Sequence, residues 1–203
     1  MLSPGRVGRL ALALLGAIPA RPVRGQDVDV HAALGATYAT SLVEDRIFED
    51  IEVRQAIAPT LFLGAGLPIG PRYRVGAEAA LATGSYDAKA ESGSTDLGTV
   101  RTAAITLGLT GTVVDRLHWR VGVGLLKYFP ADETGIFRRG GPAPLLAGVG
   151  AEYRLPWRRG WQFVALARYD VHRFTTDELE ARGFPRSRSI HRVALGLGLT
   201  RVH

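Results

Sequence analysis

Alternation of apolar and polar residues recurs in eight runs after residue 27, and no other feature constrains the fold of this chain as strongly. In the first run Leu34, Tyr38 and Leu42 share one parity, while Asp29 and Thr37 share the other. A period of two is typical of a β-strand with one apolar and one polar face. Eight such strands without a helical segment between them predict an antiparallel all-β domain. The predicted strands span residues 28–43, 52–67, 72–86, 99–113, 118–129, 144–155, 161–173 and 189–203.

Residues 1–26 are predicted to be a secretory signal peptide. Two arginines precede an uncharged apolar stretch from Leu10 to Ala20, which is too short to cross a bilayer as a helix. Cleavage after Ala20 or after Gly25 fits the small residues there, and a membrane anchor that stays attached is the alternative. We therefore expect the folded domain to comprise residues 27–203.

The charge and the cysteine content argue against two classes of function. The net charge is +6, but the first 25 residues contain four arginines and no acid, which leaves only +2 for the rest of the chain. The positive charge is therefore no indication of nucleic-acid binding. The chain contains no cysteine, so disulfides and thiolate metal sites are excluded, and neither a metal nor a cofactor is predicted.

The connections between the predicted strands alternate in length. Three short turns rich in turn-forming residues span 68–71, 114–117 and 156–160. Four longer polar loops span 44–51, 87–98, 130–143 and 174–188. Short turns at one end and long loops at the other are typical of outer-membrane β-barrels, whose short turns lie in the periplasm.

The apolar face is predicted to point outward, into lipid. A secreted barrel of the lipocalin kind alternates with the opposite polarity, so periodicity alone does not decide. Here the polar parity carries mostly Gly, Ala and Thr, which suits the narrow interior of an eight-stranded barrel. The apolar parity is bulkier, as at Leu107, Val123 and Leu197, and its aromatic residues gather at both strand ends, where membrane interfaces would lie. These aromatic residues are Tyr73, Trp119, Tyr153 and Trp161 near the short turns, and Tyr38 and Tyr169 near the loops.

On strand number, loop asymmetry and aromatic girdles, residues 27–203 resemble the small eight-stranded outer-membrane proteins, such as the OmpA transmembrane domain and OmpX. The resemblance implies an up-and-down transmembrane β-barrel in the bacterial outer membrane, with periplasmic termini. It also implies contacts with outer-membrane lipid and lipopolysaccharide, and with the barrel-assembly machinery during biogenesis. We expect a monomer. The last strand departs from the pattern of such proteins, because it ends at His203 rather than at an aromatic residue.

Charged residues of the inward parity are predicted to form two layers inside the barrel. The layer near the short turns comprises Asp29, Glu78 and Glu152 with Arg74, Arg120, Arg154 and His31. The layer near the loops comprises Arg54, Arg168 and Arg192 with Glu52, Asp170 and His172. Because buried charges must be paired, we expect these networks to fill and rigidify the lumen. A gate or solute pathway through exchanging ion pairs is the alternative.

Two pairs of residues invite a catalytic interpretation, but no enzymatic activity is predicted. Lipid A deacylases place a His and a Ser two positions apart on a lipid-facing strand, and Ser189 and His191 share the outward parity here in the reverse order. A serine nucleophile needs a base and a group that orients the base, and no outward-facing acid adjoins this pair. Asp170 and His172 are expected to be rim residues of a solvated mouth.

The loops and the loop-side surface suggest what the barrel contacts. Arg101 and Arg173 face outward at headgroup height on the loop side, where they would suit lipopolysaccharide phosphates. The sequence therefore predicts a structural or interaction role in which four loops are presented outside the cell. A narrow channel for ions or small solutes and a lipid A-modifying enzyme are the alternatives.

Overall fold

The computed structural model describes residues 28–45, 51–90, 93–132, 135–138, 140–181 and 188–202. The predicted signal peptide and its candidate cleavage positions lie outside these residues. In the described part of the chain, no helix combines the length and the hydropathy needed to cross a membrane.

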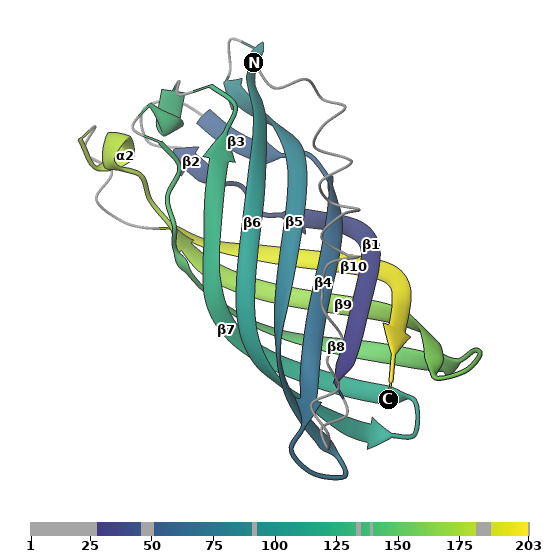
Figure 1. The fold of residues 1–203 in the computed structure, drawn as a ribbon. Helices are drawn as coiled ribbons and strands as arrows, with labels where there is room; N and C mark the ends of the chain where they lie inside the picture. Colours follow the sequence, from purple (N-terminus) through teal and green to yellow (C-terminus); the bar gives the residue numbers. More distant parts are fainter. Residues whose placement is uncertain are drawn as a thin grey trace.

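Eight strands close into one antiparallel barrel, as the sequence predicts (Figure 1). Each barrel strand pairs with the next one along the chain, and the first pairs with the last. The barrel strands are β1 (Asp29–Ala39), β4 (Ala58–Pro68), β5 (Tyr73–Ala90), β6 (Gly93–Val114), β7 (Leu117–Pro130), β8 (Leu145–Pro156), β9 (Trp161–Phe174) and β10 (Arg188–Arg201).

The pairing register tilts the strands and sets which residues share a level. One row of paired residues runs through Asp29, Gly66, Gly76, Gly108, Gly122, Gly148, Asp170, Arg192 and Ala39. From Asp29 to Ala39 the row has returned to β1 ten residues further along, and this stagger is what lets a tilted sheet close. The row therefore climbs from the short-turn end of the barrel to the loop end, and it passes five consecutive glycines on the way.

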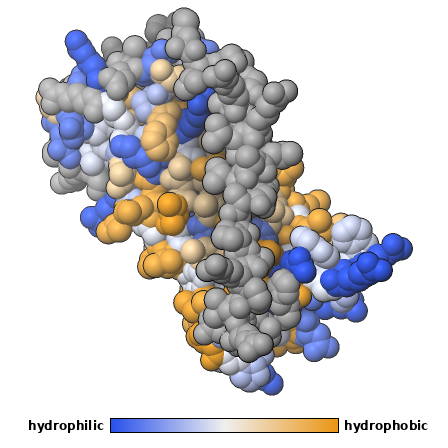
Figure 2. Space-filling model, in the orientation of Figure 1, coloured by the Kyte–Doolittle hydropathy of each residue, from blue (hydrophilic) through white to orange (hydrophobic). Residues whose placement is uncertain are grey.

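The apolar parity faces outward, as predicted. On adjacent positions of β6, Leu107 is 65% exposed whereas Thr106 is 8% exposed, and Val123 on β7 is 64% exposed. Figure 2 shows hydrophobic residues along the middle of the visible wall and hydrophilic residues toward its two ends. Both aromatic girdles are present. Tyr73 contacts Trp119 at the short-turn end with ring centroids 6.4 Å apart, and Tyr38 is exposed at the loop end.

The prediction was wrong about the loop-side ends of the first two strands. The first strand ends at Ala39 rather than at residue 43, and the predicted strand 52–67 is interrupted between Gln55 and Ala58. The short strands β2 (Val43–Asp45) and β3 (Ile51–Gln55) pair with each other, and β3 pairs with the extension of β5. The break turns Leu42 into the barrel, where it is 1% exposed, although its parity predicts an outward position.

The polar segment 87–98 was also wrongly predicted to be a loop. Strands β5 and β6 continue through it as a hairpin, with Asp87 opposite Asp96 and Ala90 opposite Gly93. On β5 the charged Asp87 and Lys89 alternate with Ala88 and Ala90, so the segment lacks the bulky apolar face on which a period-two analysis depends. The two other long connections contain a 3-10 turn, η1 (Gly135–Phe137), and a short helix, α2 (Asp177–Ala181).

Candidate functional site

A layer of buried ion pairs crosses the turn-side half of the lumen. Glu78, on β5, is its centre and is 5% exposed. Arg120 Nη1 lies 2.9 Å from Glu78 Oε1, and Arg168 Nη2 lies 2.8 Å from Glu78 Oε2. His31 Nε2 approaches the same Oε2 at 2.9 Å. One carboxylate therefore gathers groups from β1, β7 and β9.

The other two carboxylates extend the layer across the barrel. Glu152 accepts Arg168 Nη2 at 2.6 Å and Arg154 Nη2 at 2.7 Å. Asp29 meets Arg74 Nε at 2.5 Å and Arg154 Nη1 at 3.6 Å. Since Arg154 contacts both Glu152 and Asp29, and Arg168 contacts both Glu152 and Glu78, the ion pairs form one continuous network.

Arg168 occupies a different layer from the one that the sequence suggested. Its strand position predicts a place near the loops, but its guanidinium reaches toward the short turns and bridges Glu78 and Glu152. Gly150, opposite Arg168 in the register, makes this possible, because a Cβ there would lie 2.9 Å from Arg168 Cδ. The turn-side layer therefore contains four arginines against three carboxylates, rather than the balanced three and three that parity predicts.

The network leaves little space inside the barrel at this level. A cavity of about 30 Å³ remains among the charged side chains, which is room for no more than a few water molecules. Its lining includes Asp29, His31, Glu78, Arg120 and Glu152. Buried charges without partners cost several kcal/mol, so the network stabilises the barrel only as an intact set.

An apolar cluster fills the loop-side half of the lumen, where the sequence predicts a solvated mouth. Tyr128 stacks on Phe137 with ring centroids 6.2 Å apart and meets Phe174 edge-on at 5.3 Å. Phe137 comes from η1 and Leu179 from α2, so both connections contribute to the closure. We call this set the mouth plug; its main members are Leu42, Tyr86, Val100, Leu126, Tyr128, Phe137, Leu146, Phe174, Leu179 and Ile190.

Only part of the predicted second layer lies in the lumen, because Arg192, Asp170 and His172 face inward whereas Arg54 and Glu52 do not. Arg192 is buried, and its Nη2 lies 3.4 Å from Thr102 Oγ1. Arg54 instead pairs with Glu52 at 2.6 Å on β3, outside the lumen, and its side chain is 57% exposed. Hydrogen bonds from Arg54 and from Ser41 lower the pKa of Glu52 below its ordinary value. Arg54 and Glu52 lie outside the lumen because the chain is interrupted between β3, which carries them, and β4 of the barrel wall. The inward parity of β4 therefore does not extend to β3.

The two pairs considered for catalysis in the sequence, Asp170 with His172 and Ser189 with His191, have other contacts in the structure. His172 is 2% exposed, and its Nε2 lies 2.8 Å from the hydroxyl of Tyr128, within the plug rather than at a solvated rim. On the outer surface, His191 Nδ1 lies 2.6 Å from the hydroxyl of Tyr169. Ser189 lies opposite Arg173 in the register. Within the described residues, no group of His, Asp and Glu side chains is arranged to hold a metal ion.

Sequence reasoning missed the mouth plug, although the signal was present. The plug residues Tyr86, Tyr128 and Phe174 follow the inward parity of their strands, and they are bulky and apolar only near the loop ends. On β5 and β7 the inward residues thus change from charged near the short turns, at Arg74 and Arg120, to aromatic near the loops, at Tyr86 and Tyr128. The contribution of η1 and α2 carries no periodic signal in the sequence.

The comparisons with known proteins agree with this geometry at the level of the fold. No protein-family model matches the chain, and no curated protein matches its sequence. Three solved structures match with a TM-score of 0.56 each. OprG from Pseudomonas aeruginosa is 11% identical, and the match covers 88% of this chain and 96% of OprG. The outer membrane protein AlkL is 15% identical, with 91% and 94% covered, and Neisserial surface protein A is 10% identical, with 89% and 100% covered.

The chain has the fold of a small outer-membrane β-barrel. The bacterial outer membrane is the localisation that this architecture implies, and the lipid-facing wall and its two girdles fit that environment. At this level of identity the likeness concerns the fold alone. The role of the protein has to be argued from its own lumen and surface.

Proposed function

We propose that this protein is a closed outer-membrane barrel with a structural or interaction role, which presents its loop-side elements to the outside of the cell. The observation that carries the proposal is that two independent obstacles fill the lumen. The ion-pair layer around Glu78 and Glu152 occupies the turn-side half, and the mouth plug occupies the loop-side half.

Closure at both levels favours a scaffold over a channel. An eight-stranded barrel has an interior barely wide enough for its own side chains, and here those side chains are arginines and aromatic rings. Opening the turn-side layer would separate buried ion pairs, which is costly unless every charge finds a new partner. Opening the mouth would also expose the apolar plug to water. A channel role requires both changes at once.

Regular secondary structure extends the barrel on the loop side, where the sequence predicts four loops. The β5–β6 hairpin projects beyond the apolar wall, and β3 pairs along it. Helix α2 begins beside Thr176, whose Oγ1 accepts a hydrogen bond from the backbone N–H of Leu179 at 3.2 Å. Because Leu179 and Phe137 also belong to the mouth plug, the closed lumen anchors α2 and η1 in place. The mouth plug would thereby hold α2 and η1 rigid on the outer side of the barrel.

Conductance in planar lipid bilayers tests the proposal against the channel alternative. We expect the folded wild-type protein to insert without discrete conductance steps. Phe137→Ala, which thins the mouth plug and leaves the ion-pair layer intact, should insert and remain silent as well. Insertion is verified by the heat-dependent gel mobility that folded barrels show. Reproducible single-channel steps from the wild-type protein would contradict the scaffold role and support the channel.

A further inference from the structure

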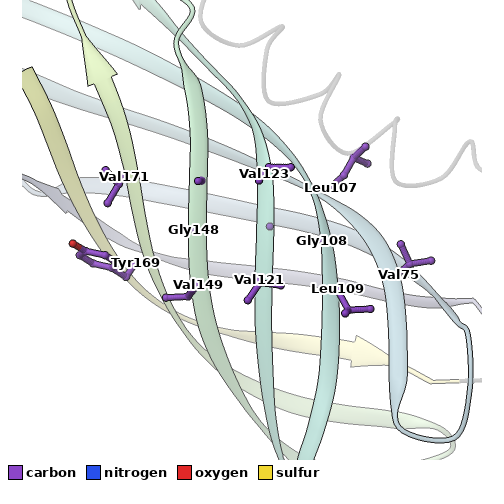
Figure 3. Close-up of a pocket in the computed structure, with 12 residues that line it drawn as sticks. Val75, Leu107, Gly108, Leu109, Val121, Val123, Gly148, Val149, Tyr169 and Val171 are labelled. Carbon is purple, nitrogen blue, oxygen red and sulfur yellow. The ribbon is translucent and has the colours of Figure 1, made fainter. Parts of the chain in front are cut away.

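A groove of about 620 Å³ crosses the outer wall of the barrel (Figure 3). It runs over β5, β6, β7, β8 and β9 and is lined almost entirely by apolar groups. One bank is formed by outward side chains that include Leu107, Val123 and Val171. The other bank includes Leu109 and Val121, two positions away on the same strands.

The floor of the groove is part of the glycine row that winds round the barrel. Gly108, Gly122 and Gly148 are paired neighbours on three adjacent strands. Their lumen side is occupied by other residues, since a Cβ at Gly148 would lie 1.9 Å from Asp170 Oδ1 and one at Gly108 would lie 3.2 Å from Arg120 Nε. The floor is therefore bare backbone, with Asp170 and Arg120 behind it on the lumen side.

The groove runs obliquely, because it follows the tilted row of paired residues around five strands and from the short-turn side toward the loop side. Its lower end is at Val75, two residues after the start of β5 at the short turns. Its upper end is at Val171, three residues before the end of β9 at the loops. Four interstrand steps of about 4.8 Å give a length of roughly 19 Å along the groove. This is enough for one acyl chain, which spans about half of the roughly 30 Å hydrocarbon core of a bilayer.

Polar groups stand at the upper end of the groove. The hydroxyl of Tyr169 lies 2.6 Å from His191 Nδ1, and the backbone N–H of His191 donates to Thr40 Oγ1 at 3.1 Å. Arg173 follows Val171 on the same face of β9 and is exposed. Arg173 and the hydrogen-bonded pair of Tyr169 and His191 therefore lie where the apolar groove reaches the level of the lipid headgroups. A cation beside an apolar groove suits a phosphate that is attached to an acyl chain.

We propose that this groove binds one acyl chain of lipid A, the membrane anchor of lipopolysaccharide, and that Arg173 binds a lipid A phosphate. The loop side of an outer-membrane barrel faces outward, so the polar end of the groove lies in the outer leaflet, where lipopolysaccharide resides. The proposal rests on the orientation of the barrel and is independent of whether the lumen conducts.

A second groove on the outer wall differs from the first in its position along the barrel. About 380 Å³ in volume, it lies over β8, β9 and β10 near the short turns. Tyr153, Phe163 and Leu197 are among its lining residues, and no basic side chain lines either groove. The basic residue that follows the second groove is Arg201, two residues after Leu199 on the same face of β10, at the short-turn end. That end faces the periplasm rather than the outer leaflet, so we assign no lipid A to this groove.

Native mass spectrometry of the folded, full-length mature protein tests the assignment. The protein is refolded in lipid-free detergent and then mixed with equal amounts of purified lipid A and phosphatidylglycerol. We expect one lipid A to be retained per barrel. Ala147→Phe fills the groove and should reduce retention by about tenfold, which the loss of two buried methylenes is enough to produce. Arg173→Gln removes the cation and should also reduce retention by about tenfold, because a hydrogen bond to a charged group contributes a similar free energy.

Two matched variants control for general effects. Ala151→Phe adds the same ring on the outward face of β8, two residues beyond Val149, the last groove residue on that strand, and Arg201→Gln removes an exposed arginine at the short-turn end of β10. Both should retain lipid A as the wild type does, and all four variants should show the heat-dependent mobility of a folded barrel. Equal retention of phosphatidylglycerol, a dimer abolished by Ala147→Phe, or no retained lipid would each overturn the proposal.

Discussion

Replacing Glu78 with glutamine is expected to lower the free energy of unfolding by ~3–5 kcal/mol, the typical loss when one partner of a buried ion pair is removed. The substitution keeps the shape of the side chain but leaves Arg120 and Arg168 facing each other without the carboxylate between them. The measurement is reversible urea unfolding of the barrel in lipid vesicles, followed by tryptophan fluorescence.

The same substitution at an exposed pair is the matched control. Glu52 pairs with Arg54 outside the lumen, so Glu52→Gln should cost at most about 1 kcal/mol. The double variant Glu78→Gln with Arg120→Met should cost less than the sum of the two single changes, because contacting residues are coupled. Equal losses for Glu78→Gln and Glu52→Gln would show that the ion-pair layer is not a buried network.

Replacing Val123 with arginine should destabilise the barrel by ~2–4 kcal/mol, because this position lies in the middle of the apolar wall. Val114→Arg makes the same change at the short turn, where the cost should fall to about 0–1 kcal/mol. The two valines are 64% and 62% exposed, so exposure alone would predict equal effects. Unfolding in vesicles measures both variants, and a Val123→Arg barrel as stable as the wild type would place this wall in water.

The barrel could be predicted from the sequence because a period of two is a local signal that each strand repeats. The outward positions of Leu107 and Val123 and the girdle residue Tyr73 all follow from parity and from distance to the turns. The carboxylates Asp29, Glu78 and Glu152 were likewise placed in one layer by parity, and the structure brings them into one network.

The sequence-based predictions of the lumen are wrong where long side chains or segments without periodicity make the contacts inside the barrel. Parity places the Cα of Arg168 correctly, but it does not show how far its guanidinium reaches over Gly150. Phe137 and Leu179 reach the lumen from connections without periodicity, so the mouth plug was missed. The outer groove depends on the register between strands, which sets Gly108 beside Gly122 and is not encoded in either strand alone.

Modification of a single cysteine by a charged, water-soluble thiol reagent tests the closed lumen most directly, because the chain has no cysteine of its own. Ala104→Cys places the thiol inside the barrel, where Ala104 is 5% exposed, and Ser94→Cys places it on the exposed hairpin. In folded protein in bilayers, we predict complete modification of the Ser94→Cys variant and none of the Ala104→Cys variant until it is unfolded. Modification of both at similar rates would mean that water and solutes fill the lumen, and the account of a closed scaffold would be wrong.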